Sequence, residues 1–230
     1  MSGIESLYPF LYGEAEATSP AGDTGGSVFD DVRRSTREKV AEIAALREQV
    51  IAEYAEALAS CAIAIAASFA GGGRLWAFGN GGSSTDAQAV AALFAAPETE
   101  GAVCLPAVAL TADVAALTAL SNDVSFDVVF ARPLAAAGRP GDVAFALSTS
   151  GGSANVLRGL AEARHRGLVT VGLAGYDGGA MAEPGAVDHL FVMRSSSVHR
   201  IQEAQTTVYQ VLGELTRRAL GAPAGPATDG

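Results

Sequence analysis

The spacing of hydrophobic positions along the chain changes near residue 73. From Phe29 to Ala70 the apolar residues recur at helical spacing, and the glycines at 71–73 end this pattern. The pattern predicts one bent helix or two consecutive helices. After residue 73, short apolar runs alternate with helical stretches, which is typical of a parallel sheet with both faces covered.

Five apolar runs have the length and composition of strands. They are Arg74–Phe78, Leu105–Thr111, Asp142–Ser148, Leu168–Gly175 and His189–Met193. Helices are expected at Ser84–Ala95, Asp113–Leu120, Phe126–Ala137, Ser153–His165 and Val198–Leu220. The composition of the ends predicts flexible segments at 1–28 and 222–230, which leaves 29–221 as one domain.

Charge and composition limit the possible partners. The 230 residues carry a formal net charge of −10 and a pI near 4.7, which argues against a nucleic-acid partner. The first residues lack a basic signal-peptide region, and the longest apolar run, Ala57–Ala70, is too short for a bilayer span of about 20 residues. Cys61 and Cys104 are expected to be buried thiols in a reducing compartment. We therefore expect a cytoplasmic protein that binds neither nucleic acid nor membrane.

Two glycine- and serine-rich loops follow predicted strands. The first contains Asn80 and Ser83 in "GNGGS", and the second is "STSGGSANV", from Ser148 to Val156. Hydroxyls, free backbone N–H groups and a helix dipole together form a phosphate cradle without lysine. A serine–glycine turn with a capping serine is the simpler alternative, but two such loops favour phosphate. A dinucleotide site is disfavoured because Ser84 replaces the third glycine, and no Gly-Lys-Ser/Thr of a Walker loop occurs.

Five segments, in this order, resemble the SIS-domain phosphosugar proteins. They are "FGNGGSSTDAQ", "LTALSNDVSFDVVF", "GDVAFALSTSGGSANV", "GLAGYDGGAMA" and "HRIQEAQ". The similarity covers roughly Val32 to Leu220 and is greatest to the phosphoheptose (sedoheptulose 7-phosphate) isomerases and the DnaA initiator-associating protein. It implies a flavodoxin-like three-layer α/β/α fold and a homotetramer whose sites are completed by neighbouring subunits. It also implies that the phosphate is bound by Ser83, Ser148, Thr149, Ser150 and Ser153, and that the sugar is lined by Asn80, Asp123 and Gln202.

The sequence departs from this resemblance at the positions that carry chemistry. A histidine and a glutamate of the family isomerases correspond to Ala89 and Leu93, and the catalytic histidine corresponds to Gln210. Gln202 alone remains of the family's metal-ligand set. We therefore expect no metal and no cofactor, and proton transfer would lack its usual base.

Other side chains offer substitutes. His199 and Glu203 are one helical turn apart, so their side chains could form an acid–base pair for catalysis. Asp86 is expected to lie in the first turn of its helix, where a carboxylate usually caps the helix or complements its dipole.

The sequence is compatible with three functions. The first is a phosphosugar-binding protein that has lost the metal and acid–base apparatus. The second is an active aldose–ketose isomerase with a rewired site at His199, Glu203 and Asp123. The third is a protein-interaction or regulatory module.

Overall fold

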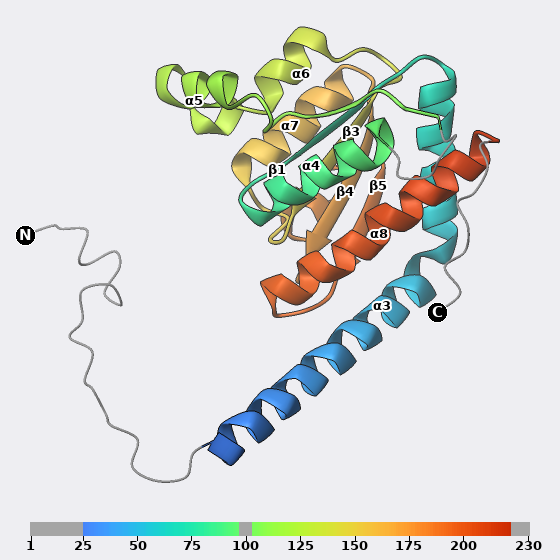
Figure 1. Ribbon diagram of the computed structural model, residues 1–230. Helices are drawn as coiled ribbons and strands as arrows, with labels where there is room; N and C mark the ends of the chain where they lie inside the picture. The colour runs from blue at the N-terminus through green and yellow to red at the C-terminus, as the bar shows by residue number, and fades with distance from the viewer. Residues whose placement is uncertain (1–24, 97–102, 222–230) are drawn as a thin grey trace, which may run out of the picture. The chain divides into compact units, whose positions relative to one another are not determined.

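The computed structural model describes residues 25–96 and 103–221, and its centre is a five-stranded parallel sheet (Figure 1). The strand order is β2-β1-β3-β4-β5. The strands are β1 (Leu75–Gly79), β2 (Ala107–Ala109), β3 (Val143–Ser148), β4 (Val169–Gly175) and β5 (His189–Met193). The predicted α/β class with five parallel strands is confirmed.

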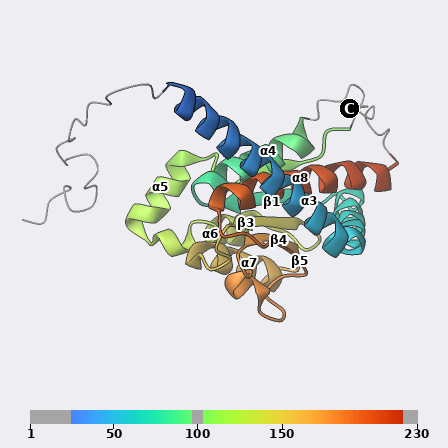
Figure 2. The same cartoon turned by 90° about the horizontal axis from the view of Figure 1, so that it is seen from below.

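Helices cover both faces of this sheet. They are α3 (Gly25–Ala70), α4 (Gly82–Ala95), α5 (Val114–Asp123), α6 (Ala131–Ala137), α7 (Ala154–His165) and α8 (Val198–Ala219), with short 3₁₀ helices η1 (Phe126–Val128) and η2 (Gly179–Ala182). Seen from below, α4 and α8 lie on one side of the sheet and α6 and α7 on the other (Figure 2). The sandwich therefore has the three layers that the family resemblance implied.

The central strand β3 shows how the two cores are built. All six of its residues are buried, because helices exclude water from both sides. Phe145 and Leu147 belong to the core shared with α3, α4 and α8, whereas Ala144 and Ala146 belong to the core under α6 and α7. This alternation follows from the two-residue period of a strand.

The strand order also shows where a ligand would bind. The chain runs from β1 outward to β2, and then returns across β1 to form β3 on the other side. In an open parallel sheet, the crevice at the carboxyl ends of two such diverging strands is the usual ligand site. The two serine- and glycine-rich loops follow β1 and β3, so both lie at this crevice.

The chain divides into two compact units, Met1–Val40 and Ala41–Gly230. In the first unit, the described residues form the beginning of α3 and carry exposed ion pairs, such as Arg34 with Asp31 at 2.6 Å. In the second unit, α3 contributes Leu58 and Ile65 to the core. The flexible segments expected at 1–28 and 222–230 lie outside the described residues, except that α3 already begins at Gly25.

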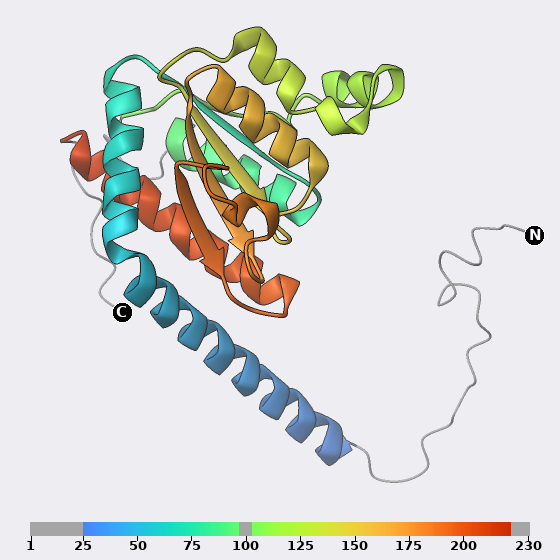
Figure 3. The same ribbon diagram turned by 180° about the vertical axis from the view of Figure 1, so that it is seen from behind.

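Tyr54, in the part of α3 that belongs to the second unit, contacts the edge strand β5. The Tyr54 hydroxyl accepts a hydrogen bond from the Val192 N–H at 3.3 Å, and its ring packs edge-on against Phe191 with centroids 5.5 Å apart. Figure 3 shows this part of α3 beside the sheet. Pairing of an edge N–H with a tyrosine removes a donor that could otherwise pair with another strand.

Within the described residues, α3 has the length and composition of a membrane span from Val28 to Ala70, although 33% of its most apolar window is buried inside the protein. This apolar helix is weak evidence for a membrane span, since core helices of soluble proteins meet the same criterion.

The two cysteines differ in exposure. Cys61 is buried as expected, and burial raises the pKa of its thiol to about 12. The prediction that Cys104 is buried is wrong, because its side chain is exposed.

A buried aspartate joins the amino-terminal ends of β1 and β3. The Asp142 carboxylate accepts hydrogen bonds from the Arg74 N–H at 2.9 Å, the Trp76 Nε1–H at 2.9 Å and the Arg139 N–H at 3.1 Å. Its side chain is 2% exposed. Removal of this carboxylate would leave three donors, one of them a buried indole N–H, without their acceptor.

We therefore expect Asp142→Ala to lower the free energy of unfolding by about 3 kcal/mol, because buried donors that lose a charged acceptor bear most of their desolvation cost. Urea unfolding followed by circular dichroism measures this change. The control is Asp113→Ala, which removes a helix cap on Ala116 and should cost about 1 kcal/mol. Equal losses of stability in the two variants would contradict the role of the Asp142 carboxylate as the buried acceptor of three hydrogen bonds.

Candidate functional site

Three serine hydroxyls meet in the loop between β3 and α7. The Ser148 Oγ lies 3.4 Å from the Ser150 Oγ and 3.3 Å from the Ser153 Oγ. Ser148 is buried, whereas Ser150 is exposed. Ser153 occupies the N-cap position of α7 but makes no capping hydrogen bond with its side chain. The Val156 N–H in the first turn of α7 donates to the Asn155 Oδ1 at 2.9 Å. The N–H groups of Ala154 and Asn155 remain available to an anion beside the three hydroxyls.

The β3–α7 loop is held by the turn that follows β4. The Gly175 N–H donates to the Thr149 carbonyl at 3.0 Å, and the Met181 N–H donates to the Gly151 carbonyl at 3.0 Å. Gly151 has φ 62° and packs so tightly against the Gly178 carbonyl that a side chain would collide with it. Glycine is therefore required at 151, and the hydroxyls lie on a supported backbone.

Ser83 brings the β1–α4 loop next to this cradle. It is buried in the first turn of α4. Gly79 pairs with Leu147 across the sheet, and a side chain on Gly79 would come within 2.8 Å of the Ser83 Cβ. Because Leu147 directly precedes Ser148, the two loops are neighbours.

Asn80 has a partner that sequence reasoning missed. Its Nδ2 donates to the Asn155 Oδ1 at 2.8 Å, and the Asn155 Nδ2 donates to the Asn80 Oδ1 at 2.9 Å. The two amides thus join the β1–α4 loop to the first turn of α7. In this arrangement Asn80 orders the two loops through its amide.

Gln202 reaches the same region from α8. Its Nε2 donates to the Asp86 Oδ2 at 3.2 Å, and its amide lies against Gly82. Burial raises the pKa of the Asp86 carboxyl, and the hydrogen bond from Gln202 lowers it in part. The structure therefore brings Gln202 to the N-terminal end of α4, as a residue lining the sugar would require.

Asp123 and Thr149 are less closely connected with the cradle. Asp123 is exposed at the end of α5 and accepts a hydrogen bond from its neighbour Asn122 at 2.7 Å. Helix α5 buries none of its residues. Thr149 is half-buried and follows Ser148 directly, so its position is fixed by the loop. The structure shows no hydrogen bond between Asp123 and the other expected site residues.

The expected His199–Glu203 pair is not formed. The Glu203 carboxylate accepts a hydrogen bond from the Arg200 Nη1, and the Arg200 Nε lies 3.4 Å from the Glu42 Oε2 of α3. His199 is exposed at the start of α8. Glu203 is thus part of an ion-pair network that joins α8 to α3.

The positions that the resemblance assigned to metal and acid–base groups do not fit a metal ion. Ala89 has no donor atom, the Leu93 side chain packs on Gly213 of α8, and Gln210 is exposed. In residues 25–96 and 103–221, no three His, Cys, Asp or Glu side chains are placed to bind one ion. With Gln202 as the remaining donor, these positions fall short of the three or more ligands that a zinc site needs.

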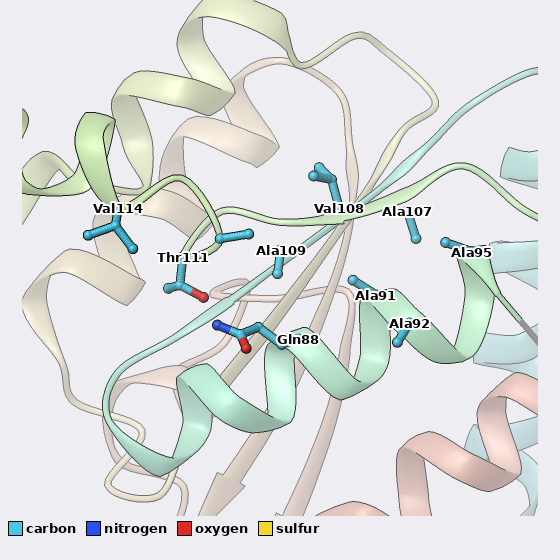
Figure 4. A pocket seen from close by; sticks show the side chains of 10 residues that line it. Gln88, Ala91, Ala92, Ala95, Ala107, Val108, Ala109, Thr111 and Val114 are labelled. Carbon is cyan, nitrogen blue, oxygen red and sulfur yellow. The ribbon is translucent and has the colours of Figure 1, made fainter.

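A separate cavity of about 440 Å³ lies between α4 and the edge strand β2 (Figure 4). Its walls are mainly alanine side chains, with the Gln88 amide and the Thr111 hydroxyl at one end. Among the residues that the structure describes, the buried Thr111 Oγ1 has no hydrogen-bond partner. None of the residues expected to bind phosphate lines this cavity.

The sequence and the fold are similar to those of known proteins. The SIS domain family matches residues 40–175. The phosphoheptose isomerase of Paramagnetospirillum magneticum is 42% identical over 194 residues, which cover 80% of this chain and 100% of the relative. That of Chlorobaculum tepidum is 41% identical over 87% of this chain and 95% of the relative.

Solved structures give the same result. The phosphoheptose isomerase of Neisseria gonorrhoeae is 33% identical, covers 79% of this chain and 96% of its own, and superimposes with a TM-score of 0.72. A phosphoheptose isomerase from Francisella tularensis also has a TM-score of 0.72, at 27% identity over 83% of this chain.

Proposed function

The chain belongs to the phosphoheptose isomerase group of the SIS-domain family, and from this we propose that it binds a sugar phosphate such as sedoheptulose 7-phosphate. The observation that carries the proposal is the convergence of the hydroxyls of Ser148, Ser150 and Ser153 at the start of α7, where the N-cap Ser153 makes no capping hydrogen bond. A phosphate dianion can accept hydrogen bonds from these hydroxyls and from the helix N–H groups. Such local donors are needed because the whole chain has a net charge of −10.

We also propose that the protein binds the sugar phosphate but no longer catalyses its isomerisation. Ala89, Leu93 and Gln210 cannot exchange protons near neutral pH, and Glu203 is engaged by Arg200. A sugar phosphate held by the serine loop would therefore meet no free acid–base pair at these positions. A binding, sensing or scaffolding role follows from this arrangement.

We also propose which partners the protein has. Strong negative charge supports a protein that avoids nucleic acid. Exposed apolar side chains at the start of α5 and on η1, namely Val114 (63% exposed) and Phe126 (51% exposed), support burial against further subunits, as in a homotetramer.

Thermal unfolding with and without ligand tests the proposal. At a concentration of about 100 times its dissociation constant, a sugar phosphate should add about 2.7 kcal/mol of stability and raise the melting temperature by about 5–10 °C. The same sugar without phosphate should leave the melting temperature unchanged. An equal rise with the free sugar would contradict a phosphate-directed site.

A further inference from the structure

Two helix starts approach each other where α4 and α8 meet beside the cradle. Asp86 and Gly82 belong to α4, and Gln202 belongs to α8. The Gln202 Nε2 donates to the Asp86 Oδ2 at 3.2 Å and also lies directly against Gly82. A methyl group at 82 would collide with this amide. The amide is therefore fixed from two sides.

The position of Asp86 differs from the expected helix cap. Helix α4 has no acidic residue in its first turn, and its N-cap is Gly81 without a side-chain hydrogen bond. The one hydrogen bond that the structure gives to the Asp86 carboxylate comes from Gln202. The expectation that Asp86 caps or complements the start of α4 is thus wrong, because the side chain turns toward α8.

The surroundings make a purely stabilising role difficult to explain. In the part of the chain that the structure describes, the Asp86 side chain is half-buried and forms no ion pair. The neighbouring Tyr209 of α8 is neutral, and its own pKa is raised mainly by burial and further by the charge of Asp86. A partly buried carboxylate without a cation costs stability. A role in orienting the adjacent Gln202 amide explains why a carboxylate is present at this position despite its cost.

The hydrogen bond to Asp86 determines how Gln202 can meet a ligand. One N–H of its amide points to Asp86, which leaves the second N–H and the Oε1 for other partners. The described residues provide no hydrogen bond to this Oε1. Gln202 thus offers one donor and one acceptor at the N-terminal end of α4, next to Ser83.

We propose that Asp86 is a positioning residue that orients the Gln202 amide toward the hydroxyls of a bound sugar phosphate, while the serine loop binds the phosphate. The inference rests on the proposed function and adds to it a division of labour. Affinity for the sugar depends on Asp86 and Gln202, whereas affinity for the phosphate does not. Gly82 permits the arrangement because it has no side chain.

Titration calorimetry with sedoheptulose 7-phosphate and, separately, with inorganic phosphate tests this division. Asp86→Ala and Gln202→Ala should each weaken sugar-phosphate binding by about threefold to tenfold, the worth of one hydrogen bond, and leave the affinity for phosphate unchanged. The double variant should bind no more weakly than Gln202→Ala alone, because Asp86 acts through Gln202. Asp86→Asn retains an acceptor oxygen and should recover most of the affinity.

Two further variants separate positioning from general damage. Thr85→Ala changes an exposed neighbour on α4 and should bind both ligands as wild type does. Gly82→Ala displaces the Gln202 amide without removing the carboxylate, so it should reproduce the sugar-specific loss even if Asp86→Ala does not fold. Additive effects of Asp86 and Gln202, or an equal loss for inorganic phosphate, would overturn the inference. Absence of sugar-phosphate binding by the wild type would instead refute the proposed function itself.

Discussion

Replacement of both Ser148 and Ser150 by alanine is expected to weaken sugar-phosphate binding by about 100-fold or more. Hydrogen bonds to a charged group are worth about 1.5–3 kcal/mol each, and two hydroxyls of the cradle are lost together. The Ser148 Oγ lies within 3.4 Å of both neighbouring hydroxyls, so its removal also frees the Ser153 hydroxyl to rotate away. The stabilisation of the fold by the ligand should disappear in a thermal unfolding experiment.

The fold itself should survive this double substitution. Serine and alanine differ by one oxygen, and the backbone of the loop is held by the β4–η2 turn through the Thr149 and Gly151 carbonyls. Ser121→Ala is a matched control, since its hydroxyl bonds only to the Leu117 carbonyl of its own helix in the structure. Binding by the double variant within about threefold of wild type would show that the phosphate is bound elsewhere.

The sheet could be predicted from the sequence because its pattern is produced by burial. Strand β3 is apolar from Val143 to Leu147, since both of its faces are covered. Its predicted limits of Asp142–Ser148 differ from the observed ones by one residue. Strand β2 is shorter than predicted and covers only Ala107–Ala109. Pro106 lacks an N–H, and β2 lies at the edge of the sheet, so little pairing is available to extend it.

The candidate site could be predicted in part, for a similar reason. The serine loop depends on residues that are close in sequence, and its hydroxyls converge as expected. The pairs Asn80–Asn155 and Asp86–Gln202 join residues 75 and 116 positions apart. Their formation depends on how each helix is rotated about its axis, which the hydrophobic pattern defines only coarsely.

The end of α4 gives another example of a contact that sequence reasoning missed. The Arg217 guanidinium of α8 donates to the carbonyls of Leu93 at 2.7 Å, Phe94 at 3.2 Å and Val103 at 2.7 Å. Arg217 lies in the last turn of α8, where the side chains of basic residues are commonly exposed. It is buried because α4 ends beside it, and the carbonyl groups at a helix end have no partner within the helix.

Turnover of sedoheptulose 7-phosphate is expected to be absent, or slower by about 10²–10⁴-fold than with a positioned acid–base pair. Isomerisation requires a base that takes a proton from one carbon and returns it to the next. Of the substitutes available on α8, the Glu203 carboxylate is held by Arg200, and His199 is exposed without a partner to orient it in the structure. Asp86 has a raised pKa but is bound to the Gln202 amide.

Isomer exchange followed by NMR in deuterated water measures this turnover. The interconversion of the isomers is seen directly, and deuterium enters the sugar whenever the proton on the base exchanges with solvent before it is returned. Wild type is compared with His199→Ala and Glu203→Gln at a sugar-phosphate concentration that saturates binding. We expect no incorporation with any of the three proteins, beside a clear affinity for the sugar phosphate. Deuterium incorporation by the wild type that both variants abolish would contradict the loss of catalysis and identify His199 and Glu203 as the acid–base groups. Incorporation that both variants retain would direct attention to Asp86, the remaining carboxylate beside Gln202, and Asp86→Asn should then abolish it.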